Sequence, residues 1–483
     1  MALKTRQEYI NSLRDGREIY WDGERITDIT THPKFRIPIE IAARDFDYDD
    51  PYKREILTYV ADDGERTHRI FQVPRTEADL QARIALGHHL SIVGGVTAVF
   101  MALLNVLDEV AQANPQYAQN IERMYQYARA NDLRAAEVIT DAKGDRSRKA
   151  HEQDDPDLYV RIVDRNEKGI VVRGAKLHIT AAALVNELVV MPTKAMRPEE
   201  KDYAVAFSIP VNTPGVKIIN RSFAHADDIN PFDFPFSARA SIPEGFVIFD
   251  DVLVPWDRVF LAGESKLAGT FARSLGLWER TLGLLEASER ARIMVGLAQL
   301  VTEQQGKEHK PEAQNTIAEM ICYAELIRMS LDYAVRHYEK TPSGMVYPNV
   351  LAVNVAKYYY AANYHDMVKN IHDLGGGLVL TLPTEADLRN EASGKYLRKY
   401  LHTRPDVDVE ERMRVYNAIR DLTADAYGGW HQVTTIQAGG GLYAQRVMMN
   451  RLFDMQGAKA AAKSASGARL TEAEVHAQQR KHA

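Results

Sequence analysis

Hydrophobic and polar positions along the chain follow three successive patterns. Between about 77 and 130, apolar residues recur every three or four positions, as on the buried face of amphipathic helices. Gly94-Gly95 interrupts this spacing, and Asn114-Pro115 has the composition of a helix start. The first part of the chain is therefore predicted to be helical.

From Tyr159 to Phe260 the pattern changes to short runs of β-branched and aromatic residues, separated by turns rich in Gly, Pro and Asn. No helix of useful length is predicted between these runs. The strands should therefore pair mostly antiparallel, in a sandwich or a barrel. The predicted strands cover 169–172, 188–191, 204–207, 216–219 and 246–249.

Helical spacing returns from about Leu267, with further helices predicted over 313–338, 349–374 and 409–427. The final stretch is rich in Ala, Ser, Lys and Gln, which is typical of a frayed helix or a mobile tail. The predicted organisation is a helical domain (1–145), a β domain (146–266), a helical bundle (267–456) and a tail (457–483).

Composition narrows the possible functions. The chain has 483 residues and a net charge of −6, whereas a nucleic-acid-binding surface needs a basic footprint. Its single cysteine, Cys322, excludes an internal disulfide, a thiolate zinc site and a cluster held by several cysteines. No apolar run approaches the roughly 20 residues that span a bilayer. We expect a cytoplasmic protein with no metal, membrane or nucleic-acid partner.

Three glycine-rich or charged segments could carry chemistry. The segment 439–444 matches G-x-G-x-x-A but follows no predicted strand, so it is either a turn between helices or a backbone surface open to a phosphate. The loop 141–147 is either a solvated connector or a cofactor-binding segment that offers Lys143 and Arg146 at a domain junction. The glycines 375–377 exceed what a helix end needs, which suggests a close backbone approach or a flexible turn.

These segments belong to a series of motifs that runs in fixed order from Arg6 to about Met455. The series resembles the 4-hydroxyphenylacetate 3-monooxygenase family, which comprises the oxygenase components of two-component flavin monooxygenases, and their sister enzyme 4-hydroxybutyryl-CoA dehydratase. The motifs include Thr30-Thr31-His32-Pro33, the loop 141–146, Asp155-Pro156-Asp157-Leu158-Tyr159, Asn230-Pro231-Phe232-Asp233, Val252-Leu253-Val254-Pro255-Trp256-Asp257-Arg258 and Leu382-Pro383-Thr384-Glu385-Ala386-Asp387.

The resemblance implies an α+β, acyl-CoA dehydrogenase-like fold with an N-terminal helical domain, a central antiparallel β-barrel and a C-terminal four-helix bundle. It also implies a homotetramer, built as a dimer of dimers, with FAD between the β domain and the bundle. The hydroxyl of Thr180 would face the flavin N5 edge, although a strand threonine with a purely structural role is the alternative. By the same resemblance Asp141, Lys143, Gly144 and Arg146 would line the flavin, and Gly376, Gly377 and Gly440 would lie near its pyrophosphate or adenine.

The two relatives differ in what their chemistry requires. The dehydratase needs a [4Fe–4S] cluster held by three cysteines and a histidine, but this chain carries Glu279 and Glu286 at two of those positions and has only Cys322. The monooxygenase needs reduced flavin and O2, which give a C4a-hydroperoxyflavin, and an activated phenol. We therefore expect a reduced-flavin-dependent aromatic hydroxylase, supplied with FADH2 by a separate NAD(P)H:flavin reductase.

The chain departs from the 4-hydroxyphenylacetate enzymes at their substrate contacts. The arginine and tyrosine of their substrate loop are missing from the segment 94–100, and Glu137 replaces the histidine that would bind the phenol. The substrate is therefore expected to be a phenolic or similarly electron-rich ring, less anionic or larger than 4-hydroxyphenylacetate. Glu137 could act as a base or cap a helix, and His178 could be a polar group near the flavin or a structural residue.

Two other functions remain open. One is a redox-neutral FAD-dependent isomerase or lyase from the dehydratase branch, and the other is a non-enzymatic flavin-binding scaffold.

Overall fold

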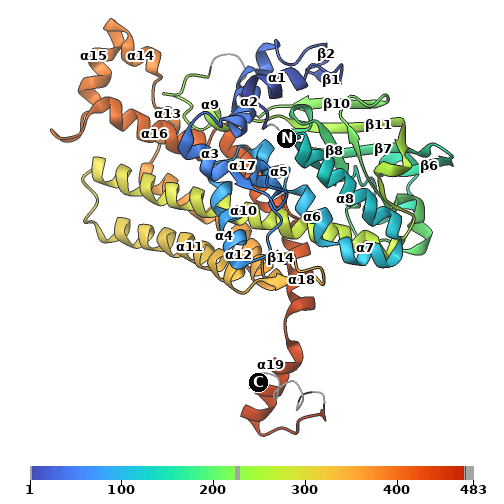
Figure 1. Cartoon of the computed structure of the whole chain (residues 1–483). Coiled ribbons are helices and arrows are strands. Elements are labelled where there is room, and N and C mark those ends of the chain that lie inside the picture. The colour runs from blue at the N-terminus through green and yellow to red at the C-terminus, as the bar shows by residue number, and fades with distance from the viewer. Residues whose placement is uncertain (1–2, 224–228, 473, 475–483) are drawn as a thin grey trace.

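The structure is a computed structural model that describes residues 3–223, 229–472 and 474. Helices near the N-terminus lie between two β-sheets on one side and a bundle of long helices on the other, and the C-terminal helices project from the bundle (Figure 1). The N-terminal helices are α1 (Arg6–Ser12), α2 (Pro33–Ala43), α3 (Pro51–Leu57), α4 (Glu77–Gly87), α5 (Ile92–Val96), α6 (Val99–Asn105), α7 (Leu107–Ala113) and α8 (Pro115–Ala130).

Local capping explains where these helices begin. The Thr76 side chain caps α4 in a capping box with Asp79, and Asn114 caps α8, with Pro115 in its first turn. The predicted break at Gly94-Gly95 is shifted, because both glycines lie inside α5 and the chain leaves the helix on either side of it. Ser91 caps α5 and also donates a hydrogen bond to the buried carboxylate of Asp45.

The β region consists of two mixed sheets. The larger has the order β2 (Glu24–Ile26), β1 (Glu18–Trp21), β10 (Val216–Arg221), β11 (Glu244–Pro255), β7 (Gly169–Thr180), β6 (Arg161–Asn166). The smaller has the order β12 (Val259–Ala262), β9 (Val205–Pro210), β8 (Glu187–Val190), β5 (Ala135–Val138). Two short hairpins complete the strands: β3 (Thr58–Val60) with β4 (Arg66–His68), and β13 (Glu339–Lys340) with β14 (Val346–Tyr347).

Pairing in these sheets is mostly antiparallel, as predicted, but β1 pairs with β10 and β5 with β8 in parallel. Among the described residues the strands form two open sheets, whereas the resemblance implies a closed barrel. A barrel closes only when the edge strands of the two sheets are hydrogen-bonded to each other, and here the edge strands of each sheet are not hydrogen-bonded to the other sheet. The sheets meet through side chains such as Phe207 and Phe249, whose rings are 5.8 Å apart.

Long helices dominate the C-terminal half. The bundle contains α10 (Ser265–Gln304), α11 (Pro311–Arg336), α12 (Val350–Gly375) and α16 (Val409–Thr423). The predicted helix over 409–427 is divided at Ala424, after which α17 (Ala426–Gln437) packs against α12. The other helices are α9 (Ser237–Ala240), α13 (Leu378–Thr381), α14 (Glu385–Arg389), α15 (Glu391–Tyr400), α18 (Leu442–Leu452) and α19 (Met455–Ser466).

The predicted tail begins inside α19, and its last residues, 475–483, lie outside the described residues. Within the described part of the chain, no single helix is long and apolar enough to cross a membrane. One pair of shorter helical stretches, 92–105 and 107–113, meets the length and composition criteria only when joined across a 46° bend.

A bulge in β7 changes which side chains face the core. Up to Lys176 the even-numbered positions of β7 from Ile170 onward are buried, but beyond the bulge Ile179 is buried and Thr180 is half-exposed. His178 lies at the bulge with a φ of 58°, in the left-handed region that histidine enters more readily than most residues. The bulge thereby turns Thr180 away from the side occupied by Lys176.

A buried ion pair anchors the same strand to the loop that follows β5. The Lys176 ammonium lies 2.7 Å from the Asp141 carboxylate, and each side chain is at most 3% exposed. Lys176 also donates to the carbonyl oxygens of Ile139 and Met191, and the Thr193 hydroxyl donates to Asp141. Each charge therefore depends on the other for its stabilisation inside the protein.

We expect Asp141→Asn to lower the free energy of unfolding by about 3–5 kcal/mol, because it leaves the Lys176 ammonium buried without a carboxylate. The double variant D141N/K176M should recover most of that loss, because it removes the unpaired charge. Chemical denaturation at pH 7 measures both. A single variant as stable as the parent chain, or a double variant less stable than the single one, would contradict this role.

Candidate functional site

Three polar side chains meet where the larger sheet approaches α17. Thr180 ends β7 and pairs in register with Glu244 at the start of β11. The Thr180 hydroxyl lies 3.0 Å from Oε2 and 3.2 Å from Oε1 of the Glu244 carboxylate, and the Trp430 indole nitrogen donates to Oε1 over 3.0 Å. Strand pairing and α17 thus hold the predicted flavin-facing threonine in a defined orientation.

Aromatic rings hold the tryptophan of this group in place. Phe223 stacks on Trp430 with ring centres 4.6 Å apart and planes 18° apart, and Tyr427 lies against both rings. Burial raises the pKa of the Glu244 carboxyl, while the hydrogen bonds from Thr180 and Trp430 lower it to a smaller degree. Thr180 itself stays half-exposed.

The loop 141–146 divides into a buried start and a charged, exposed end. Asp141 is occupied by Lys176, whereas Lys143 and Arg146 have no carboxylate partner among the described residues. Burial lowers the pKa of Lys143, and the nearby Arg146 lowers it further. Gly144 has a φ of 51°, in the left-handed region that favours glycine, and a Cβ there would also meet the side chains of Gln153 and Leu158. Lys143 and Arg146 are the members of this loop that remain free to bind an anion.

The predicted glycine positions lie at opposite ends of α12. Gly440 is next to Arg280, whose guanidinium donates to Asn354 near the start of α12 and to the Gly439 carbonyl. Gly376 and Gly377 follow the last residue of α12, so about 22 residues, or about 33 Å along the helix axis, separate them from Asn354. Both are exposed, and no atom lies within 4 Å of a Cβ placed there. Within one subunit these glycines and Gly440 do not share a site.

Glu137 belongs to a cluster of carboxylates between β5 and α10. Burial raises the pKa of Glu137 well above its usual range, and the nearby Glu279 carboxylate raises it further. Glu279 accepts a hydrogen bond of 2.8 Å from the Gly439 amide, which ties the cluster to the turn before α18. Glu286 lies two helical turns beyond Glu279 on the same face of α10; it is exposed, and partial desolvation together with the Glu279 carboxylate raises its pKa.

Glu137 and Glu286 have no hydrogen-bond or ion-pair partner among the described residues. Glu137 also lies near the end of β7 at which Thr180 is found. Asp141 and Lys176 form an antiparallel bridge, and Glu137 and Thr180 are each four residues beyond it in opposite chain directions. Strands β5 and β7 are in contact along this stretch. The arrangement brings two of the predicted catalytic residues to one region, whereas His178 is exposed at the bulge.

Two cations lie beside the carboxylates on the bundle side. Lys357, on α12, donates to the Thr435 carbonyl and lies 4.5 Å from the centre of the Tyr360 ring. Burial lowers its pKa to about 7, although Glu279 acts in the opposite direction. Arg290 donates to the Thr435 hydroxyl over 3.3 Å and lies 5.8 Å from the Tyr364 ring centre. The site therefore combines acidic groups on α10 and β5 with cations on the bundle.

Some buried polar atoms of this region have no protein partner. The Tyr364 hydroxyl and the His431 Nε2 atom are both buried and both unpartnered. Buried polar groups in proteins are nearly always satisfied, so unpartnered ones mark places where a ligand or water completes the site. Together with half-exposed Thr180 and the unpaired cations of the 141–146 loop, these groups fit a ring with several hydrogen-bonding edges and a phosphate-bearing tail.

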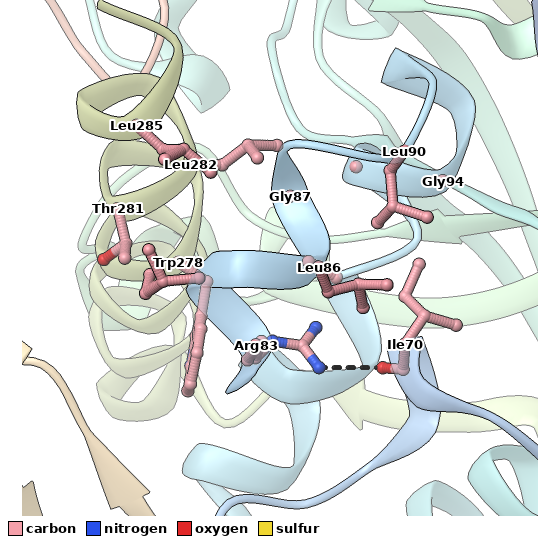
Figure 2. Close-up of a pocket in the computed structure, with 13 residues that line it drawn as sticks. Ile70, Arg83, Leu86, Gly87, Leu90, Gly94, Trp278, Thr281, Leu282 and Leu285 are labelled. Carbon is pink, nitrogen blue, oxygen red and sulfur yellow. Dashed lines mark hydrogen bonds between the residues drawn. The ribbon is translucent and has the colours of Figure 1, made fainter. Parts of the chain in front are cut away.

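An apolar pocket adjoins the loop that replaces the family's substrate arginine and tyrosine. It lies between α4 and α5 on one side and α10 on the other, and Leu86, Leu90, Leu282 and Leu285 line it (Figure 2). The Arg83 guanidinium closes one end by donating to the Ile70 carbonyl over 2.8 Å. A Cβ at Gly95 would come within 2.8 Å of Leu282. The pocket walls are thus mostly apolar, with the Arg83 guanidinium as a charged group at one end.

Sequence reasoning did not find Glu244, Trp430 or Lys357. Glu244 and Trp430 carry no local signal, because their partners are 64 and 186 residues apart along the chain. Lys357 did carry a local signal, because it interrupts the apolar stripe formed by Val353, Tyr360 and Tyr364 on a predicted helix. Within residues 3–223, 229–472 and 474, no group of three or more His, Cys, Asp or Glu side chains could hold a metal ion.

Comparison with solved structures agrees with this architecture. The chain superposes on an oxygen-tolerant archaeal 4-hydroxybutyryl-CoA dehydratase from N. maritimus with a TM-score of 0.88, at 26% identity over 98% of this chain and 97% of that one. It superposes on the oxygenase component of 4-hydroxyphenylacetate 3-monooxygenase, complexed with FAD and 4-hydroxyphenylacetate, with a TM-score of 0.86, at 28% identity over 95% and 98%. A glutaryl-coenzyme A dehydrogenase shares the fold alone, with a TM-score of 0.51 at 12% identity over 96% and 94%.

Sequence comparison gives the family. A 4-hydroxyphenylacetate 3-monooxygenase oxygenase component from Thermus thermophilus is 31% identical over 88% of this chain and 89% of its own length. The oxygenase component of a 4-nitrophenol 4-monooxygenase/4-nitrocatechol 2-monooxygenase from Rhodococcus opacus is 29% identical over 92% and 87%. The models for the N-terminal and C-terminal parts of 4-hydroxyphenylacetate 3-hydroxylase match residues 5–261 and 268–467. The chain therefore belongs to the 4-hydroxyphenylacetate 3-hydroxylase family, whose acyl-CoA dehydrogenase-like fold it shares.

Proposed function

We propose that the chain is the oxygenase component of a two-component flavin-dependent monooxygenase that hydroxylates a phenolic ring. The observation that carries the proposal is the half-exposed Thr180 hydroxyl, held by Glu244 at the junction of sheet and bundle in a chain of this family. FADH2, when bound, would supply the reaction with O2 from which one oxygen atom enters the ring. A separate NAD(P)H:flavin reductase would provide the reduced flavin.

The residues that would hold FAD come from three segments. Thr180 would contact the N5 edge, and the unpaired Lys143 and Arg146 would bind phosphate oxygens. Because Gly440 has no side chain, the cofactor could approach the protein backbone closely there, next to Arg280. Gly376 and Gly377 are too far along α12 to reach the same cofactor, so a second subunit would contribute them, which agrees with a homotetramer.

The proposed catalytic role of Glu137 is to accept the phenolic proton. A phenol has a pKa of about 10, and its phenolate is the better nucleophile. A carboxylate is a more effective base when its pKa is raised toward that of the phenol, and both burial and Glu279 raise the pKa of Glu137. Because Glu137 and Glu279 interact, they would titrate as a pair and act as one unit.

The carboxylates also bear on the substrate. Glu137, Glu279 and Glu286 would repel a substrate that carries its own carboxylate, while the apolar pocket beside Gly95 favours a hydrocarbon surface. We therefore propose a phenol whose second substituent is neutral or cationic.

A redox-neutral isomerase or lyase is the weaker candidate. The dehydratase relative needs cysteine ligands for its cluster, but the single Cys322 is exposed on α11, and glutamates occupy the positions on α10. No contact in the site favours that chemistry over hydroxylation.

The purified chain, mixed with FAD, NADH and a general flavin reductase under air, should convert a phenol into a product heavier by one oxygen atom. Oxygen uptake and product mass measure this, and omission of the chain is the control for uncoupled flavin oxidation. If the chain binds FADH2 but every phenol in a broad panel stays unmodified, the proposal is wrong.

Glu137→Gln should lower kcat for hydroxylation by about 100-fold, because the base is lost, while reduced flavin still binds. Activity of the parent chain should fall as the pH drops through the raised pKa of the Glu137–Glu279 pair.

The stability of the folded chain should change with pH in the opposite sense to its activity. Ionising a carboxyl whose folded-state pKa is raised costs stability as the pH rises, so E137Q should melt higher than the parent, and by more at pH 8 than at pH 4.

The matched control is Glu289→Gln, which removes a carboxyl from the solvent-exposed side of α10. It should leave both kcat and the pH dependence of melting unchanged. Unchanged turnover in E137Q would remove Glu137 from the mechanism.

Tyramine and p-cresol should have a kcat/KM at least about tenfold higher than that of 4-hydroxyphenylacetate, because only the last carries an anionic substituent toward the carboxylates. The three compounds share one phenol ring, so the comparison isolates charge. A preference for 4-hydroxyphenylacetate would show that the carboxylates do not face the substrate.

A further inference from the structure

The hydrogen bonds at Glu244 determine the direction in which Thr180 can donate. A carboxylate only accepts hydrogen bonds, and an indole N–H only donates. Trp430 therefore donates to Glu244, and Thr180 uses its single hydroxyl proton on the same carboxylate. The Thr180 oxygen then has only lone pairs left to offer to a ligand at its open side.

This orientation distinguishes the two redox states of a flavin. The N5 atom of a reduced flavin carries a hydrogen and donates, whereas N5 of an oxidised flavin has only a lone pair and accepts. An acceptor at Thr180 satisfies the first and repels the second, and a buried polar atom left without a partner is costly.

We propose that Glu244 is a positioning residue that commits the Thr180 proton and thereby makes the site prefer reduced over oxidised flavin. The inference rests on the proposed function, because it takes Thr180 to be the residue at N5. It assigns a purpose to a partly buried acid that has no cationic partner among the described residues. An oxygenase that receives reduced flavin and must release oxidised flavin to a separate reductase gains from such a preference.

The surrounding contacts keep this arrangement from reversing. Register between β7 and β11 places Glu244 directly opposite Thr180, and the Ala181 amide donates to the Pro243 carbonyl beside them. The stack of Phe223 on Trp430 fixes the indole N–H toward Glu244. Glu244 is thus held between two donors and does not need to move when a ligand arrives.

Glu244→Gln tests the proposal because it reverses the hydrogen bond without changing the shape of the side chain. The amide oxygen must face the Trp430 N–H, so the amide NH2 faces Thr180 and donates to it. Thr180 thereby loses its nearer acceptor, Oε2, and can donate toward the ligand in place of the weaker contact with Oε1. The variant should lower the ratio of the Kd for oxidised FAD to the Kd for FADH2 by about tenfold, which lowers the midpoint potential of bound FAD by about 30 mV.

The measurement is an aerobic titration of the chain with FAD, an anaerobic titration with FADH2 and a dye-equilibrated potential of the bound flavin. Thr180→Val, which removes the hydroxyl at constant shape, should lower the reduced-state preference as well. In a T180V background, E244Q should have no further effect on the potential. Trp430→Phe is the control for disturbed packing, and it should leave the potential within a few millivolts of the parent, because Thr180 still donates to Glu244.

The outcomes separate this inference from the proposed function. A chain that binds FAD in neither redox state contradicts both. A chain that binds FAD with an unchanged potential in E244Q, or in T180V should E244Q fail to fold, overturns the role of Glu244 and leaves the flavin site intact. The role of Glu244 is supported if E244Q and T180V each lower the potential and if the double variant has the same potential as T180V.

Discussion

The candidate site depends on one irregularity in strand pairing, the bulge at His178 in β7. Before the bulge, alternate residues of β7 face the core, and Lys176 is buried against Asp141. The bulge shifts the alternation by one residue, so Ile179 takes the core position and Thr180 turns toward Glu244 and α17. Without it, Thr180 would point to the side on which Lys176 is buried.

Charged side chains are arranged in two different ways in this protein. Asp141 and Lys176 neutralise each other and hold the chain segments on which the site is built. Glu137, Glu279 and Glu286 form no ion pair among the described residues. Desolvation raises the pKa of each, and the Glu279 carboxylate adds to the shifts of Glu137 and Glu286. Within this chain the Asp141 carboxylate is paired with Lys176, and its place beside the flavin stays a prediction.

Local sequence patterns predicted the helices, which depend mainly on residues close together in the chain. The spacing of Leu275, Trp278 and Leu285 predicted the central helix α10, and Asn114-Pro115 predicted the start of α8. The parallel pairings of β1 with β10 and of β5 with β8 were missed, because strand neighbours are chosen by packing between distant segments. The same limit applied to Glu244 and Trp430, which meet only after the sheet and α17 have come together.

The site residues expected from the family resemblance do not all lie in one place. Thr180 and Glu137 lie in one region, Gly440 is connected to it through Arg280 and Glu279, and Gly376 lies at the other end of α12. His178 lies at the bulge that positions Thr180, which fits the structural alternative considered for it.

The central claim is that an isoalloxazine ring lies against Thr180 between the larger sheet and α17. A crystal structure of the chain grown with FAD under reducing, anaerobic conditions tests it most directly. The account predicts electron density for the ring with N5 within hydrogen-bonding distance of the Thr180 hydroxyl oxygen. A ring bound elsewhere, or one whose N5 edge faces away from Thr180, would contradict it.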